Sequence, residues 1–186
     1  MKTLKAGDTA EYVITYLEMT ARPSFPRPHV PGSKPTALIH AENPPVWYFL
    51  TLYNAVGADH EWTDMHAEAP EVLRAYVQHE RMELFTLLYT GWPAGFFMLD
   101  RREAGRCDLA YFGLVPEAIG LGLGKYLLQT AIHMGWDHED TERMTVQTCT
   151  LDHPRALQLY QKSGFTPFKQ ETKSRVLTRD REVPKT

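Results

Sequence analysis

The stretch from Gly113 to Leu128, GLVPEAIGLGLGKYLL, constrains the fold most, because it joins an apolar strand to a helix through three closely spaced glycines. Pro116 ends the strand, and Gly120, Gly122 and Gly124 allow the backbone to turn sharply. A helix that begins after such a turn directs its unpaired N–H groups and its positive dipole end back at the turn. This arrangement predicts an anion site, above all for phosphate.

The spacing of the glycines decides between the known phosphate-binding loops. A Walker A loop needs a leading glycine and a Ser or Thr after the lysine, but Ile119 and Tyr126 stand at these positions. The dinucleotide fingerprint G-x-G-x-x-G fails as well, because this loop runs G-x-G-x-G. A third interpretation, that the glycines serve only tight packing, stays open at this point.

The composition is that of an ordinary globular chain. Of its 186 residues, 43% are apolar and 23% are charged, which is enough for one packed domain. We therefore predict a single domain over residues 1–186, with a Pro-rich loop at 21–36 and a charged C-terminal tail at 171–186. The net charge of −3 and the pI near 6.2 argue against nucleic acid as the main partner.

Several patterns indicate a soluble, cytoplasmic protein. The N-terminus, MKTLKAGDTA, has no apolar stretch, so we expect no signal peptide. No uncharged run reaches the ~20 residues of a membrane helix, so no membrane partner is expected. Cys107 and Cys149 lie far apart without the spacing of metal ligands, and free thiols suit a reducing compartment.

The order of apolar runs and turn signals predicts alternating strands and helices. Strands are predicted at residues 12–19, 82–89, 94–100, 107–115, 144–149 and 165–169, and residues 174–178 could add another. Helices are predicted at residues 43–57, at 70–79, directly after the glycine loop, and from about 153 to 164. Asn43 would cap the first helix. Asp152 or His153 would cap the last, with Pro154 in its first turn and Gly164 at its C-terminal end.

Residues 36–72 contain no Lys or Arg but hold six acids: Glu42, Asp59, Glu61, Asp64, Glu68 and Glu71. They could form a solvated acidic face. They could also line an acceptor pocket that attracts a cationic amine, because a cleft of one sign concentrates ligands of the other. The aromatic residues Trp47, Tyr48, Tyr53 and Trp62 could form the walls of such a pocket or belong to the core.

The glycine loop resembles motif A of the GCN5-related N-acetyltransferase (GNAT) family, whose pattern is Arg/Gln-x-x-Gly-x-Gly/Ala. Gly122 and Gly124 match this pattern after Pro116-Glu117, but Ile119 replaces the opening Arg or Gln. A second segment, RALQLYQKSGF from Arg155 to Phe165, resembles the family's Ala-x-x-Leu-Tyr-x-Lys-x-Gly-Phe signature. Two independent motifs in the family's order make the resemblance stronger than the loop alone.

The resemblance covers residues 82–170 and implies an α/β (α+β) GNAT-type fold. This fold has a mixed, mostly antiparallel central sheet of about six to seven strands, flanked by about four helices. It implies acetyl-CoA as cosubstrate, an amine substrate and no metal, and homodimers are common in the family. The implied coenzyme-binding residues are Leu114, Val115, Ile119, Gly120, Leu121, Gly122, Leu123, Gly124, Lys125 and Tyr160. Backbone N–H groups near Leu114 and Val115 would stabilise the oxyanion of the attacked thioester.

The resemblance also implies three catalytic candidates. Tyr160 matches the family's usual proton donor to the leaving thiolate, and Asp108 stands where several members carry a glutamate base. Because Asp is shorter than Glu, Asp108 would act through a water molecule. His153 replaces an Asn that often contacts pantetheine or acceptor, so it could donate that hydrogen bond, act as a base or only cap the helix. Tyr160 could instead be a core tyrosine, and Asp108 could merely pair with a neighbour.

The remaining histidines show no metal-ligand spacing and are interpreted as surface residues: His60, His66, His133 and His138. We predict an acetyl-CoA-dependent N-acetyltransferase that acts directly on an amine, and a small molecule suits the acidic span better than a protein. The alternatives are a non-catalytic acyl-CoA-binding regulatory module, or a protein (lysine or N-terminal) acetyltransferase. Nucleotide hydrolysis or redox chemistry on the loop is disfavoured by the failed spacings.

Overall fold

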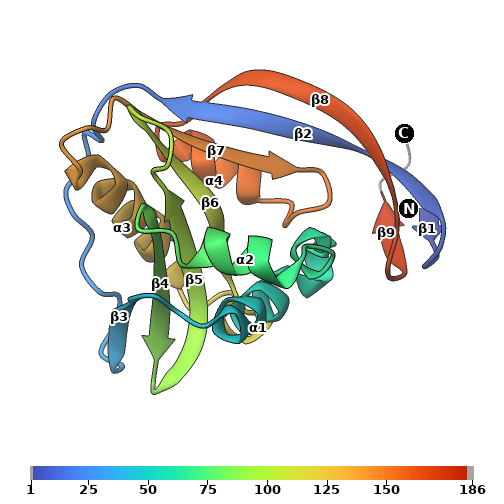
Figure 1. Cartoon of the computed structure of the whole chain (residues 1–186), viewed down its shortest axis with the longest axis horizontal. Helices are drawn as coiled ribbons and strands as arrows, with labels where there is room; N and C mark the ends of the chain where they lie inside the picture. Colours follow the sequence, from blue (N-terminus) through green and yellow to red (C-terminus); the bar gives the residue numbers. More distant parts are fainter. Residues whose placement is uncertain (1, 184–186) are drawn as a thin grey trace.

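The computed structural model describes residues 2–183, which fold around a seven-stranded sheet (Figure 1). The strands of this sheet are β2 (Thr9–Met19), β3 (Thr36–Ala41), β4 (Met82–Tyr89), β5 (Trp92–Asp100), β6 (Arg106–Leu114), β7 (Arg143–Cys149) and β8 (Thr166–Val176). The helices are α1 (Val46–Gly57), α2 (Pro70–Val77), α3 (Leu123–Asp137) and α4 (Ala156–Lys162), with short 3₁₀ turns η1 (Ala58–His60), η2 (Asp64–His66) and η3 (Pro116–Ala118). A separate two-stranded sheet pairs β1 (Lys2–Leu4) with β9 (Arg181–Val183).

The strand order is β3-β4-β5-β6-β7-β2-β8. Within the described chain, β6 and β7 run parallel, and the other neighbours in this sheet run antiparallel. A mixed, mostly antiparallel sheet with four α-helices confirms the predicted fold class.

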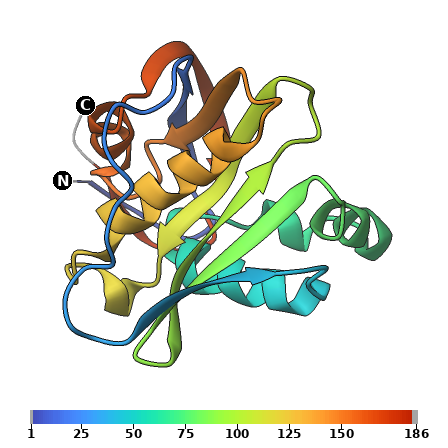
Figure 2. The same ribbon diagram turned by 90° about the vertical axis from the view of Figure 1, so that its left-hand side faces the viewer.

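Helices cover both faces of the sheet (Figure 2). On one face, Phe49 of α1 packs its ring edge-on against Tyr111 of β6. On the opposite face, Gly135 of α3 lies so close to Met144 of β7 that a Cβ would fall 2.4 Å from its methyl carbon. Because both faces are covered, six consecutive residues of β5, 94–99, are buried.

The parallel strands β6 and β7 pair only at their beginnings and then diverge. Their register runs from Arg106 opposite Arg143 to Asp108 opposite Thr145. Directly afterwards β6 carries an irregularity at Ala110, where its pairing with β5 shifts by one residue. A bulge bends the strand that carries it. Since β6 continues along β5 while β7 continues along β2, a V-shaped opening forms between them.

The two capping predictions are wrong. Pro45, in an extended conformation, precedes α1, and Asn43 has a φ of 47°. The cause is the pair of prolines, since a residue before proline is driven out of the helical region. Helix α4 begins only at Ala156, so Pro154 lies outside it, and no side chain caps it. Gly164 follows α4 with a φ of 99°, which confirms it as the C-terminal glycine.

Some strands differ from the sequence pattern. Strands β1, β3 and β9 are not predicted by it, and β3 is an edge strand with no fully buried residue. Thr90 and Gly91, both with positive φ, make a two-residue hairpin turn, so β5 begins at Trp92. β8 is one continuous strand, so residues 171–176 are part of the sheet and not of a tail.

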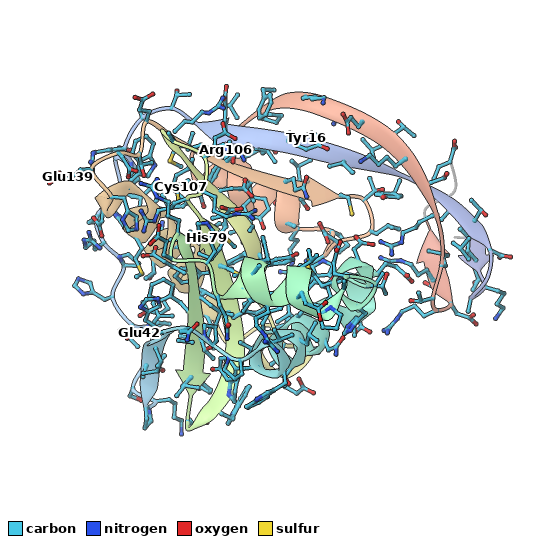
Figure 3. The ribbon with its side chains drawn as sticks, viewed as in Figure 1. Tyr16, Glu42, His79, Arg106, Cys107 and Glu139 are labelled. Atoms are coloured by element: carbon cyan, nitrogen blue, oxygen red, sulfur yellow. The ribbon has the colours of Figure 1, made fainter. Side chains whose placement is uncertain are left out.

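β2 and β8 form a long ribbon that extends past the body at the top of Figure 1, with Tyr16 of β2 labelled in Figure 3. The segment after β8 then docks on the loop that follows α1. Asp59 forms an ion pair with Arg179. Glu61, which is 1% exposed, accepts hydrogen bonds from the backbone N–H of Thr178 at 3.0 Å and from its hydroxyl at 2.8 Å. The basic residues predicted to form a tail therefore neutralise acids of the 36–72 span.

Candidate active site

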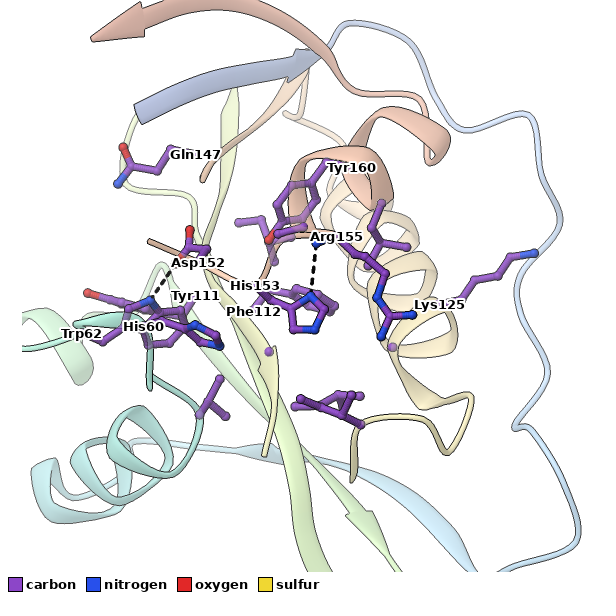
Figure 4. A pocket seen from close by; sticks show the side chains of 18 of the residues that line it. His60, Trp62, Tyr111, Phe112, Lys125, Gln147, Asp152, His153, Arg155 and Tyr160 are labelled. Carbon is purple, nitrogen blue, oxygen red and sulfur yellow. Dashed lines mark hydrogen bonds between the residues drawn. The ribbon is translucent and has the colours of Figure 1, made fainter. Parts of the chain in front are cut away.

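A pocket of about 460 Å³ occupies the V between β6 and β7 (Figure 4). One wall is residues 109–114 of β6, and the glycine loop with the start of α3 forms another. The opposite side consists of Gln147 of β7, the turn that follows β7, and helix α4. Residues from the end of α1 to Trp62 lie at one end of the pocket. The fold thus brings both sequence motifs to a single site.

The glycine loop faces this pocket with its backbone. Gly120 and Gly122 have φ values of 91° and 78°, which side chains rarely tolerate. A Cβ at either position would meet nothing within 4 Å, so the backbone conformation and not packing requires glycine there. Gly122 also precedes α3, whose N-terminus has no side-chain cap. The first N–H groups of α3 are therefore free to bind an anion, and the packing-only interpretation of these glycines is not supported.

Most of the predicted coenzyme-binding residues line the pocket: Leu114, Ile119, Gly120, Gly122, Gly124, Lys125 and Tyr160. The side chain of Leu123 is in the hydrophobic core, and Val115 also belongs to that core. Arg155, just before α4, adds a second cationic side chain to the pocket beside Lys125 (Figure 4).

The backbone of β6 decides which N–H groups reach the opening. The N–H of Val115 donates to Ala94 O at 3.0 Å, so this group is already hydrogen-bonded to β5. The prediction that Val115 helps to stabilise an oxyanion is therefore wrong. Because N–H groups alternate between the two edges of a strand, those of Leu114 and Phe112 point toward the V.

Tyr160 of α4 is 6% exposed and presents its ring to Phe112 of β6 and to Phe165, each with centroids 6.1 Å apart. Burial, followed by the charges of Asp152 and Asp108, raises the pKa of its hydroxyl. The hydroxyl therefore keeps its proton throughout the physiological pH range. Within residues 2–183 no group hydrogen-bonds its oxygen, which leaves it free for a ligand in the pocket.

Asp108 lies outside the pocket lining. It stands on the last paired rung of β6 and β7, where the hydroxyl of Thr145 donates to its carboxylate. Burial raises the pKa of this carboxyl group, and the Thr145 hydrogen bond lowers it in part. The strands have not yet diverged at this rung, and Asp108 is not part of the pocket wall.

His153 lines the pocket and holds the turn before α4. Its Nδ1 accepts the backbone N–H of Arg155 at 3.2 Å (Figure 4). Burial, together with the nearby Arg155 and His60, lowers the pKa of the imidazole, so the neutral form dominates at neutral pH. A neutral ring whose Nδ1 accepts carries its proton on Nε2. His153 therefore offers the pocket a hydrogen-bond donor, and not the free lone pair that a base needs.

Three further residues line the pocket, and the sequence pattern suggests only one of them, Trp62, as a wall residue. His60 is half-buried in the pocket wall, with its ring centroid 6.5 Å from that of His153, so its interpretation as a surface residue is wrong. Trp62 donates its Nε1–H to Asp152 Oδ1 at 3.2 Å, and both residues line the pocket. In the sequence, Asp152 carried only a capping signal. Its tertiary partner Trp62 lies 90 residues earlier.

None of the six acids of the 36–72 span lines the pocket. Asp59 and Glu61 instead hold the C-terminal segment, and Asp64 lies 3.5 Å from Arg175 of β8. The hypothesis that these acids form the acceptor pocket is not supported, and the pocket receives the carboxylate of Asp152 instead.

Two further properties bear on function. Across residues 2–183, no three His, Cys, Asp or Glu side chains gather as a metal site requires. In the same part of the chain, no helix is long and apolar enough to span a bilayer.

Comparison with known proteins identifies the family. The model of the acetyltransferase (GNAT) family matches residues 49–165, and the chain belongs to this family. None of the curated proteins compared with the chain matches it. A tandem GNAT protein from the clavulanic acid biosynthesis pathway has a similar structure, with a TM-score of 0.62 and 17% identity over 92% of this chain and 55% of that one.

Two other solved structures show the same similarity. A GCN5-related N-acetyltransferase from Sphaerobacter thermophilus has a TM-score of 0.61 and 15% identity, over 93% of this chain and 52% of that one. An aminoglycoside acetyltransferase from an uncultured soil metagenomic sample, in complex with sisomicin, has a TM-score of 0.55 and 15% identity, over 69% of this chain and 86% of that one. This chain thus spans a little over half of the length of the first two proteins. At these identities the similarity shows a shared fold.

Proposed function

We propose that this chain transfers an acetyl group from acetyl-CoA directly to the amino group of a small molecule. The observation that carries the proposal is the pocket in the V, which unites the glycine loop at the start of α3 with the free hydroxyl of Tyr160. Membership of the GNAT family supports acetyl-CoA as the donor. The structural similarity to an aminoglycoside acetyltransferase in complex with sisomicin supports a small acceptor.

In this proposal the pyrophosphate of the coenzyme binds the N–H groups at Gly122 to Lys125. Ile119 supplies no charge to the phosphates, although it stands where the family carries Arg or Gln. We propose that Lys125 and Arg155, which both line the pocket, provide the missing positive charge. The pantetheine arm would then run between β6 and β7 toward Tyr160.

The transfer itself makes one bond and breaks one. The lone pair of the neutral amine forms a bond to the thioester carbonyl carbon, and negative charge develops on the carbonyl oxygen. The N–H of Leu114, on the open edge of β6, would stabilise this charge. The C–S bond then breaks with its electron pair on sulfur, and the Tyr160 hydroxyl donates its proton to the thiolate. The products are an acetamide and the free thiol.

The acceptor arrives as an ammonium ion, which loses one proton before attack and a second when the amide forms. The second proton restores the Tyr160 hydroxyl, and the first passes to a base, which then returns it to solvent. We propose that Asp108 takes the first proton through a water molecule, because its raised pKa brings a carboxylate closer to the strength that a base requires. His153 would donate its Nε2–H to a carbonyl of the bound substrates.

The substitution Tyr160→Phe tests the function. Phe keeps the ring contacts to Phe112 and Phe165 but removes the proton donor. Release of free thiol from acetyl-CoA should be measured with a panel of primary amines, together with acetyl-CoA binding by calorimetry. We expect kcat to fall about 100-fold or more while the Kd for acetyl-CoA changes little.

Two results would contradict the proposal. If Tyr160→Phe turned over amines like the wild type, Tyr160 would not be the acid. If the wild type bound acetyl-CoA tightly but acetylated no amine, the non-catalytic acyl-CoA-binding module would be the better description.

A further inference from the structure

Asp152 lies in the turn after β7 and projects a carboxylate that is held rigidly at the pocket wall. Its Oδ2 accepts hydrogen bonds from the Thr148 hydroxyl and from the backbone N–H of Cys149, each at 2.8 Å. Its Oδ1 accepts the indole N–H of Trp62 at 3.2 Å (Figure 4). Three donors from two distant parts of the chain thus fix both oxygens of a half-buried side chain.

All three donors are neutral and bring no positive charge to the carboxylate of Asp152. Within residues 2–183, the ion pairs formed by Lys, Arg and His do not include Asp152. By contrast, Asp59 and Asp64 of the neighbouring loop each have an arginine partner. A carboxylate that is partly removed from water without a counter-ion costs free energy unless a cation binds beside it.

The walls around Asp152 suit a cation as well. The rings of Trp62 and Tyr111 both line the pocket, with centroids 5.5 Å apart and planes inclined by 60°. Aromatic faces attract ammonium groups through the negative charge above the ring. The charge of Asp152 also acts on the reaction centre, because it contributes to the raised pKa of the Tyr160 hydroxyl.

We infer that Asp152, with Trp62 and Tyr111 as walls, binds the amino group of the acceptor as an ammonium ion and selects small primary alkylamines over neutral arylamines. This inference rests on the proposed function for the identity of the pocket. Asp152 binds the substrate before the proton is lost, whereas the removal of that proton stays with the proposed base. The site consists of one negative charge and two aromatic rings, so a neutral acceptor gains little binding free energy from it.

The binding arm of the test needs no turnover. Benzyltrimethylammonium, which cannot be acetylated, is titrated into the wild type and into Asp152→Asn in the presence of acetyl-CoA. We expect the wild type to bind this cation and Asp152→Asn to bind it about tenfold or more weakly, because the charge is lost. Equal binding by both proteins, or no binding by the wild type up to millimolar concentrations, would overturn the inference.

The turnover arm compares benzylamine, a cation at neutral pH, with aniline, which is neutral. Asp152→Asn should raise the KM for benzylamine about tenfold or more and change the Kd for acetyl-CoA less than about twofold. The KM for aniline, if this amine is turned over, should change much less in Asp152→Asn. If both amines suffered equally, Asp152 would have only a structural role.

Thr148→Val is the matched control, since it removes one donor from Asp152 and keeps the charge. We expect the KM for benzylamine to change less than about threefold in this variant. A loss as large as that of Asp152→Asn would assign the effect to disturbed geometry and overturn the inference. Failure of the proposed function is distinguishable, because then no amine is acetylated while the cation titration still reports on Asp152.

Discussion

The substitution Gly122→Ala tests whether the glycine loop contacts the ligand. Its effect on ligand binding can be distinguished from the effect of backbone strain by comparison with Gly7→Ala, which is a matched control. The two glycines have φ values of 78° and 92°, and a Cβ at either position would meet nothing within 4 Å. Gly7 lies in the turn between β1 and β2, whereas Gly122 lines the pocket. Gly122→Ala and Gly7→Ala therefore impose similar strain, but only the first places a methyl group where we propose that phosphate binds.

The expected magnitudes follow from these geometries. A left-handed conformation costs a side-chain-bearing residue about 1–2 kcal/mol, which lowers the melting temperature of a domain of this size by about 2–8 °C. Both variants should show this loss. If the methyl group displaces one charge-assisted hydrogen bond from the N–H groups of α3, binding weakens by about 1.5–3 kcal/mol, or about 10- to 100-fold in Kd.

Calorimetric titration of acetyl-CoA into the wild type and both variants measures the difference. The Kd of Gly122→Ala should rise at least about tenfold, and that of Gly7→Ala should stay within about twofold of the wild type. If both variants bound acetyl-CoA equally well, the glycine loop would not be the phosphate site.

Three further substitutions test other parts of the site. Because burial raises the folded-state pKa of Asp108, its ionisation costs stability as the pH rises through that pKa. Asp108→Asn should therefore melt no lower than the wild type at pH 7.5 and lose this relative advantage near pH 4, and its turnover should fall at pH 7.5, where the wild-type carboxylate is the proposed base. A lower melting temperature at pH 7.5 would refute the assigned direction. Ile119→Arg should lower the KM for acetyl-CoA about threefold at low ionic strength and less in high salt, and unchanged KM values would place the phosphates elsewhere. His153→Asn should keep turnover within about threefold of the wild type, whereas His153→Ala should lower turnover about tenfold. The reason is that only Asn retains an acceptor for the N–H of Arg155 and a donor for the pocket. An equal loss of turnover in both variants would indicate that His153 acts as a base.

The motif-bearing half of the fold could be predicted because its signals are local. The glycines of the loop require unusual backbone angles, and such angles restrict the residue type at that position alone. Tyr160 likewise sits in a short motif with fixed helical spacing. The hairpin of β4 and β5 could be predicted because most residues of these strands are buried, and strands covered on both faces are continuous apolar runs.

The missed features depend on contacts between distant segments. The acids of the loop after α1 carry no local sign that Arg175 and Arg179, more than 100 residues later, neutralise them. Asp152 contacts the indole of Trp62 in the pocket wall, and no spacing pattern in the sequence records that contact. The Val115 amide was misassigned for the same reason, since its partner Ala94 belongs to another strand.

Thermal unfolding with four ligands tests the central claim, that the V between β6 and β7 binds acetyl-CoA. Acetyl-CoA, coenzyme A, ATP and NAD would each be added in large excess to the wild type. At about 100 times its Kd a ligand stabilises the fold by about 2.7 kcal/mol, which corresponds to a shift of about 5–10 °C here. We predict this shift with acetyl-CoA and coenzyme A but not with ATP or NAD. No shift with acetyl-CoA up to millimolar concentrations, or a larger shift with ATP or NAD, would contradict the account.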